Sequence, residues 1–96
     1  MKAAIFYEFG SPDVLKYETV EDLTPETGEI VVAVKAVTVN RVLDCAVRAG
    51  EQPQRGVVPP HIGGVDPAGI VSAVGRGVEK LNVGDHVAIL SRVPCL

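Results

Sequence analysis

The residues of this chain that are best suited to chemistry gather between positions 40 and 48. Asn40 precedes an apolar stripe, as a helix N-cap does, and its amide both donates and accepts hydrogen bonds. Arg41, Asp44 and Arg48 follow at spacings of three and four, so on a helix they share one face and Asp44 can pair with either arginine. The segment is either a solvated helix face with an asparagine cap, which the residues alone favour, or the polar wall of a ligand cleft. In the second case Asn40 donates to a carbonyl group of a substrate or to a cofactor amide.

A second cluster follows His61. The pair Gly63-Gly64 lets the backbone pass close to a neighbouring group, and Asp66-Pro67 then turns the chain. Asp66 either accepts local backbone hydrogen bonds at a corner of the fold or faces the same cleft as Asp44. Two carboxylates would suit glycoside hydrolysis at a defined separation, but nothing in the sequence sets that separation. We therefore assign no catalytic residue.

The sequence lacks the residue spacings that are typical of metal and phosphate sites. The soft and imidazole ligands are Cys45, His61, His86 and Cys95, and no Cys-x-x-Cys or His-x-x-x-His spacing occurs among them. The Gly75–Gly77 stretch lacks the third glycine and the following helix of a dinucleotide fingerprint, which favours a turn between strands. We expect neither a metal site nor a bound nucleotide on this chain alone.

Size and charge restrict the function further. The chain has 96 residues, enough for one domain, and no apolar run approaches the roughly 20 residues of a membrane span. The net charge of −3 argues against a nucleic-acid surface or a polybasic membrane anchor. The N-terminal apolar run meets Glu8 too soon for a secretory signal, and two cysteines form no disulfide framework. A reducing, cytoplasmic location is expected.

About five or six short strands and one short helix must position these residues. Valine-rich, alternating segments predict the strands, and Arg41–Ala49 is predicted to form a short helix or helical turn between the Asn40 cap and Gly50. Pro67 and Gly69 interrupt one strand, which indicates an edge, a bulge or a tight bend there. The pattern predicts a mainly β fold, a small partly open β-barrel or sandwich. The predicted strands are Ala3–Phe9, Val14–Val20, Glu29–Val39, Val65–Val74 and His86–Leu90.

Several stretches, in this order, resemble the N-terminal domain of the medium-chain dehydrogenase/reductase superfamily, the alcohol dehydrogenase and quinone oxidoreductase group. The resemblance covers nearly all of residues 1–90 and implies a GroES-like fold, a partly open β-barrel with one short helix. The tail, residues 91–96, is expected to be unstructured. The Rossmann domain of the family is absent from this chain, which corresponds either to a fragment or to a naturally short product. The matching stretches include Phe9-Gly10-Ser11-Pro12, Gly28-Glu29-Ile30, Val39-Asn40, Gly64-Val65-Asp66-Pro67-Ala68-Gly69 and Val83-Gly84-Asp85-His86-Val87.

The resemblance also bears on the site. Arg41 and Val65 occupy positions where zinc-dependent members have a cysteine and a histidine, so the chain looks like a zinc-independent member. In such members the segment that matches Asn40–Asp44 lines the cleft beside the nicotinamide, which makes the cleft interpretation the favoured one. The resemblance thus implies a substrate and cofactor cleft bordered by Asn40, Arg41, Asp44, Arg48 and Asp66.

The resemblance implies the substrate-side domain of an oxidoreductase that uses NADPH or NADH, without zinc, on a quinone, carbonyl, alcohol or enone. We expect the isolated domain to be inactive, with a small-molecule substrate as partner only in the full enzyme. Without the Rossmann domain we expect an apolar patch to be exposed, and such a patch predicts small homo-oligomers. The alternative is a stand-alone GroES-like module such as a co-chaperonin-like ring subunit, which the stretch Val83–Val87 also resembles. No long mobile loop with an exposed aliphatic tripeptide supports that alternative.

Overall fold

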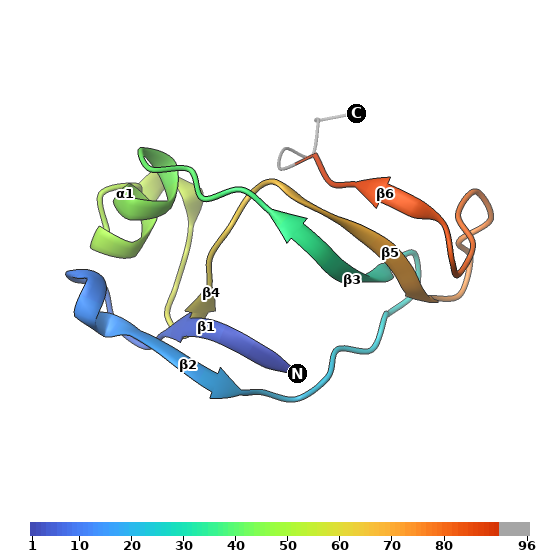
Figure 1. Cartoon of the computed structure of the whole chain (residues 1–96), viewed down its shortest axis with the longest axis horizontal. Helices are drawn as coiled ribbons and strands as arrows, with labels where there is room; N and C mark the ends of the chain where they lie inside the picture. The colour runs from blue at the N-terminus through green and yellow to red at the C-terminus, as the bar shows by residue number, and fades with distance from the viewer. Residues whose placement is uncertain (91–96) are drawn as a thin grey trace. The chain divides into compact units, whose positions relative to one another are not determined.

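A computed structural model describes residues 1–90. Two compact units make up this part of the chain, each with one three-stranded sheet (Figure 1). The first unit contains residues 1–21 and 39–64, and the second contains residues 22–38 and the chain from residue 65 onward. Neither sheet closes on itself, since each has two edge strands. The predicted tail, residues 91–96, lies outside the described residues.

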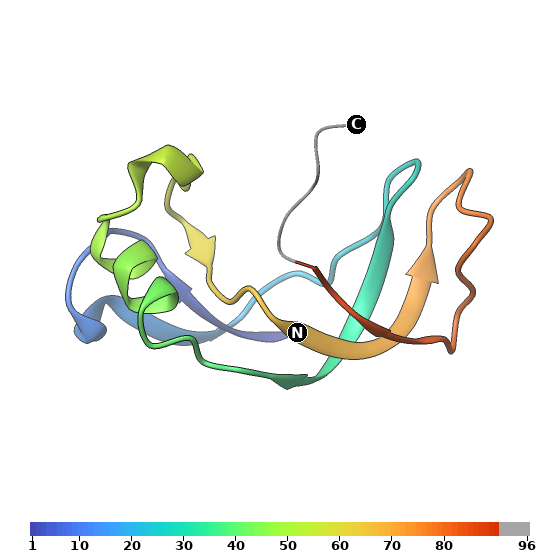
Figure 2. The same ribbon diagram turned by 90° about the horizontal axis from the view of Figure 1, so that it is seen from above.

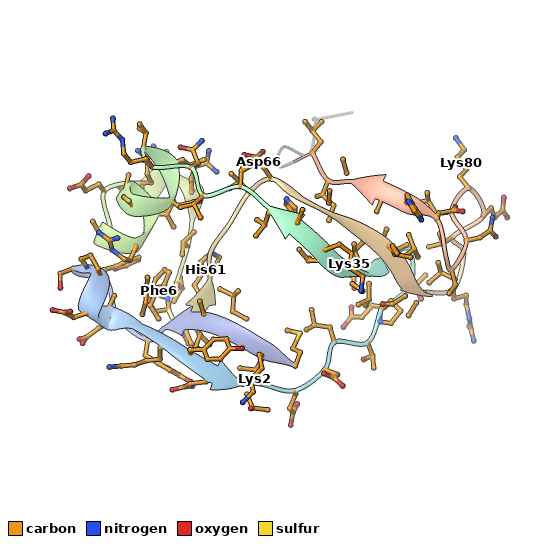
Figure 3. All side chains as sticks on the ribbon, in the orientation of Figure 1. Lys2, Phe6, Lys35, His61, Asp66 and Lys80 are labelled. Carbon is orange, nitrogen blue, oxygen red and sulfur yellow. The ribbon has the colours of Figure 1, made fainter. Side chains whose placement is uncertain are left out.

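The sheet of the first unit has strand β1 (Lys2–Phe6) in the middle. It pairs antiparallel with β2 (Leu15–Thr19) on one side and with β4 (His61–Ile62) on the other. Alternation along β1 buries Ala3 and Ile5 on one face, and Phe6 is also buried, with 2% of its surface exposed. The ring of His61 meets the Phe6 ring edge-on, with centroids 5.6 Å apart (Figure 3).

The first strand ends earlier than the sequence predicted. Alternation suggested a strand through Phe9, but β1 stops at Phe6. The rings of Phe6 and Phe9 lie 6.1 Å apart, although two residues three positions apart would point to opposite faces of a continuous strand. The chain bends after Phe6, and this bend lets both rings approach each other.

One α-helix, α1 (Leu43–Ala49), follows, and Val47 is its buried residue. The prediction began this helix at Arg41, but residues 41 and 42 form a turn ahead of it. Two one-turn 3-10 helices, η1 (Pro12–Val14) and η2 (Pro53–Arg55), each start at a proline, a residue well suited to a first turn. No helix among residues 1–90 has the length and apolar character needed to cross a membrane.

The second unit orders its strands β3 (Ile30–Val37), β5 (Pro67–Val74) and β6 (His86–Ala88). Strand β5 is central, so the edge predicted from Pro67 and Gly69 is wrong, whereas the predicted bulge is confirmed by two register shifts between β3 and β5. Pro67 is tolerated because it is the first residue of the strand. Gly69 permits a close approach of the two strands, since a Cβ there would collide with the Ala33 carbonyl oxygen. Figure 2 shows β3 and β5 running side by side.

Candidate functional site

The start of α1 is built around a reciprocal contact between Asn40 and Asp44. The Asn40 side-chain oxygen, Oδ1, accepts a hydrogen bond from the Leu43 backbone N–H at 2.9 Å. The Asp44 carboxylate in turn accepts one from the Asn40 backbone N–H at 2.8 Å. The Asp44 backbone N–H donates to the Asn40 carbonyl, which makes Asn40 the functional N-cap, as predicted. Both side chains are half-buried.

This contact determines which side-chain atoms of Asn40 can still form a hydrogen bond with a ligand. Its Oδ1 accepts the Leu43 N–H at the start of the helix, whereas its side-chain N–H groups donate to no partner within residues 1–90. An amide whose oxygen is anchored has its nitrogen oriented as well, because the two atoms share one rigid plane. The site therefore holds a positioned donor that suits a carbonyl oxygen. The Asp44 carboxylate, in turn, is bound to the Asn40 backbone N–H.

Arg48 has a different partner from the one the helical spacing allowed. Its Nε donates to the Gly10 carbonyl oxygen at 3.1 Å, and the Gly10 backbone N–H donates to the Arg48 carbonyl at 3.0 Å. Arg41 is exposed and precedes the helix. Among residues 1–90 no ion pair joins Asp44 to Arg41 or Arg48, so the predicted charged face is replaced by links to the backbone.

The end of α1 meets Phe9. Gly50 has a left-handed backbone (φ 81°, ψ 18°), as its predicted position after the helix requires. The Gly50 N–H donates to the Val47 carbonyl and the Glu51 N–H to the Ala46 carbonyl, the two bonds of a Schellman motif. The Phe9 ring packs on Gly50 so closely that an added Cβ would lie 3.0 Å from its Cγ.

A pocket of about 240 Å³ opens beside this helix end, within the first unit. Its walls are mostly apolar, with one side-chain amide from Gln52 and the Phe9 ring as the single aromatic group. Sequence reasoning missed these residues, although the proline-, glycine- and glutamine-rich composition of residues 51–61 was a signal for a shaped loop. The lining residues are Phe9, Val47, Gly50, Gln52, Pro53, Gly56, Val57 and Val58.

Asp66 belongs to the second unit, whereas the other four predicted site residues belong to the first. It is exposed, and its carboxylate accepts a hydrogen bond from the Thr38 hydroxyl at 3.3 Å. The carboxylate therefore accepts from a side chain instead of the local backbone bonds considered above. That Asp66 and Asp44 border one cleft stays a prediction.

The Gly75–Gly77 stretch lies in a turn between strands rather than before a helix. The segment around Gly75 is a turn that connects the ends of two strands: the Gly75 N–H donates to the Glu29 carbonyl, and the Arg76 carbonyl accepts from Gly28. No helix follows it within residues 1–90, so the phosphates of a nicotinamide cofactor would find no helix N-terminus here. No group of three or more His, Cys, Asp or Glu in the described part of the chain is arranged to hold a metal ion.

Comparison with known proteins gives a consistent picture. The family model described as "Alcohol dehydrogenase GroES-like domain" matches residues 26–96. An alcohol dehydrogenase of Moraxella sp. (strain TAE123) is 39% identical over 89 residues, which are 93% of this chain and 25% of that protein. A quinone oxidoreductase of Rattus norvegicus is 35% identical over 94 residues, 97% of this chain and 28% of that protein.

Solved structures agree with the sequence relatives. The Escherichia coli quinone oxidoreductase complexed with NADPH superimposes with a TM-score of 0.83 at 34% identity, over 92% of this chain and 26% of that one. The protein AibC gives a TM-score of 0.91 at 35% identity, over 99% of this chain and 26% of that one. The chain thus spans about a quarter of the length of these relatives. It belongs to the alcohol dehydrogenase GroES-like domain family, in the medium-chain dehydrogenase/reductase group that includes quinone oxidoreductases.

Proposed function

We propose that this chain is the substrate-side domain of a zinc-independent oxidoreductase that uses NADPH or NADH on a quinone, carbonyl, alcohol or enone. The observation that carries the proposal is the oriented amide of Asn40, whose N–H groups are free to donate to a carbonyl oxygen. The similarity to a quinone oxidoreductase that binds NADPH supports the same chemistry. The nicotinamide supplies the hydride when a dinucleotide domain holds it, and this chain contributes substrate contacts and excludes water.

The proposal divides the predicted site residues by role. Asn40 contacts substrate, and Arg41 and Asp66 border the cleft. Asp44 and Arg48 act as positioning residues, because Asp44 binds the Asn40 backbone and Arg48 binds Gly10.

The isolated chain is proposed to be inactive, because the described residues offer no phosphate-binding turn. Titration of the chain with NADPH, followed by isothermal calorimetry, should give only weak binding and no turnover with any quinone added. Micromolar affinity for NADPH would contradict this part of the proposal.

A domain exchange tests the function itself. Replacing the matching quarter of the E. coli quinone oxidoreductase by this chain should yield an enzyme that oxidises NADPH in the presence of tetramethyl-1,4-benzoquinone. In this hybrid, Asn40→Asp retains a capping oxygen but removes the amide donor, so it should lower kcat/KM about tenfold or more while thermal stability changes little. Unchanged kcat/KM in the folded Asn40→Asp hybrid would remove Asn40 from the substrate site.

Two further parts of the proposal concern context. A cytoplasmic location is proposed from the shortage of cysteines. The ring-subunit alternative predicts a seven-membered assembly in solution, which sedimentation velocity would reveal by its mass.

A further inference from the structure

The pocket beside the C-terminal end of α1 plays no part in the chemistry proposed for Asn40. Its volume is about 240 Å³, and all of its lining residues belong to the first unit. Among them Val47 is buried, whereas Phe9 and Val58 are 43% and 77% exposed. Apolar side chains that stay exposed around a hollow gain from an apolar ligand, because the ligand removes them from water.

Backbone contacts hold the walls of this pocket in place. The Pro53 carbonyl accepts a hydrogen bond from the Gly56 N–H at 3.1 Å, which closes the 3-10 turn η2. The Phe9 ring packs on Gly50, and the residue after Phe9 is hydrogen-bonded to the last turn of α1. The pocket is therefore formed before any ligand arrives, as sites for small molecules usually are.

Gln52 supplies the one polar side chain of the lining. Its Oε1 accepts a hydrogen bond from the Gln54 Nε2 at 2.5 Å, and this contact also orients its nitrogen. The side-chain N–H groups of Gln52 donate to no partner within residues 1–90. The lining contains no charged side chain and no nucleophile, so the pocket suits binding of an uncharged molecule and not catalysis.

The volume limits the ligand to about one ring. An engineered apolar cavity of about 150 Å³ holds benzene, and pockets for drug-sized molecules begin at about 300 Å³. The hollow of about 240 Å³ lies between these values, so it suits a six-membered ring with one or two substituents. A carbonyl oxygen accepts hydrogen bonds and donates none, which matches the free N–H groups of Gln52.

We propose that this pocket binds a neutral carbonyl compound with a single ring, with the ring between Phe9 and Val47 and the carbonyl oxygen on the Gln52 Nε2. The site is separate from the Asn40 amide, which begins α1. The helix rises about 10 Å over residues 43–49, more than a single ring spans. The proposal does not rest on the proposed function, because it needs neither the cofactor nor Asn40.

Acetophenone, a neutral ring with one carbonyl group, is the probe. Titration of the isotope-labelled 96-residue chain, followed by nuclear magnetic resonance, should give saturable shifts of the Gly50, Gln52 and Gly56 amides. Benzoate has a similar size but carries a charge, so it should bind at least tenfold more weakly. Absence of saturable shifts at these amides, or equal affinity for benzoate, overturns the proposal.

A variant of Gln52 tests the hydrogen bond. Gln52→Leu keeps a side chain of similar size but removes the donor, so it should weaken acetophenone binding about fivefold, the effect of one hydrogen bond. Ethylbenzene has no acceptor oxygen, and its affinity should not fall in this variant. Equal weakening of both compounds would mean that Gln52 only shapes the pocket, which overturns the assignment of a carbonyl ligand.

A matched pair of exposed valines tests the location. Val58 and Val83 are 77% and 62% exposed, so a change to aspartate at either position should leave circular dichroism unchanged. Val58→Asp places a charge in the lining and should weaken acetophenone binding about tenfold, whereas Val83 belongs to the second unit and Val83→Asp should have no effect. Asn40→Asp should also leave the affinity unchanged. Weakening by Asn40→Asp, or full affinity in Val58→Asp, overturns the proposed location.

Discussion

Arg48 and Gly10 hold each other through two hydrogen bonds that run in opposite directions: the Arg48 side chain donates to the Gly10 carbonyl, and the Gly10 N–H donates to the Arg48 carbonyl. The two residues are 38 positions apart. This link joins the last turn of α1 to the segment that carries Phe9, and Phe9 forms a wall of the apolar pocket. The shape of the pocket therefore depends on a residue that does not line it.

Replacing Arg48 should disconnect this link. Arg48→Met keeps an apolar stem of similar length but removes the charged donor, so the free energy of unfolding should fall by about 1.5–3 kcal/mol. Urea unfolding measures the change. Arg41→Met serves as the matched control because Arg41 is exposed, and its effect should stay within about 0.5 kcal/mol. Equal losses for both variants would mean that the Gly10 link contributes nothing specific.

The cap of α1 should behave as a coupled pair. Asn40→Ala and Asp44→Ala each remove one side of the reciprocal contact and should each lower the free energy of unfolding by about 1 kcal/mol. The double variant should lose less than the sum, because either change loosens the same helix start. Thermal unfolding of the four proteins gives the coupling, and strict additivity would show that the two bonds act independently.

Gly69 should tolerate no side chain. Gly69→Ala drives a Cβ into the Ala33 carbonyl oxygen, so the β3–β5 ladder must shift, and the loss should reach about 3 kcal/mol. Gly63 has open space around its Cβ position and no positive φ, so Gly63→Ala should be neutral or stabilise by about 0.5 kcal/mol. Chemical denaturation of the two variants side by side provides the comparison.

The hydroxyl of Tyr7 should lose its proton at a higher pH than an ordinary tyrosine does. Its hydroxyl donates to the Glu18 carboxylate at 2.6 Å, and this hydrogen bond, more than desolvation or the nearby negative charge, raises the pKa of Tyr7 above its ordinary value of 10.0. The folded state therefore holds this proton longer than the unfolded state. The resulting stabilisation is present below pH 10.0 and is lost as the pH rises through the raised pKa.

Ultraviolet titration of the phenolate measures this pKa. A Tyr17→Phe background leaves Tyr7 as the one tyrosine of the chain, which contains two. Adding Glu18→Gln should lower the pKa of Tyr7 toward its ordinary value, and Glu8→Gln, an exposed neighbour on the chain, should not. No difference between the two glutamine variants would exclude the Glu18 contact as the cause.

The ends of α1 were predictable because they depend on neighbouring residues. Asparagine caps a helix through its own side chain, and glycine ends one because it adopts the left-handed conformation at little cost. Asn40 and Gly50 do both, as predicted. The strands that overlap the predicted ranges could be predicted for a similar reason, since alternating valines favour a pleated, half-buried segment.

Other features depended on partners that are distant in sequence. Spacing on a helix put Asp44 within reach of Arg48, but the guanidinium met the Gly10 carbonyl instead. Proline and glycine in β5 were compatible with an edge, but pairing on both sides made the strand central. Phe9 lies outside β1 because its ring packs against Phe6 and Gly50, and an alternating sequence pattern does not predict such a contact.

The amino-acid sequence by itself determined the mainly β composition, the single helix with its cap and the family resemblance, because each depends on local residue types or on short motifs. Only the tertiary structure decided which atoms of Asn40 remain free, where Arg48 donates, and which loop residues line the pocket beside Phe9. These features depend on which distant segments meet, and hydrogen-bonding groups are satisfied by whichever partner the fold brings within reach.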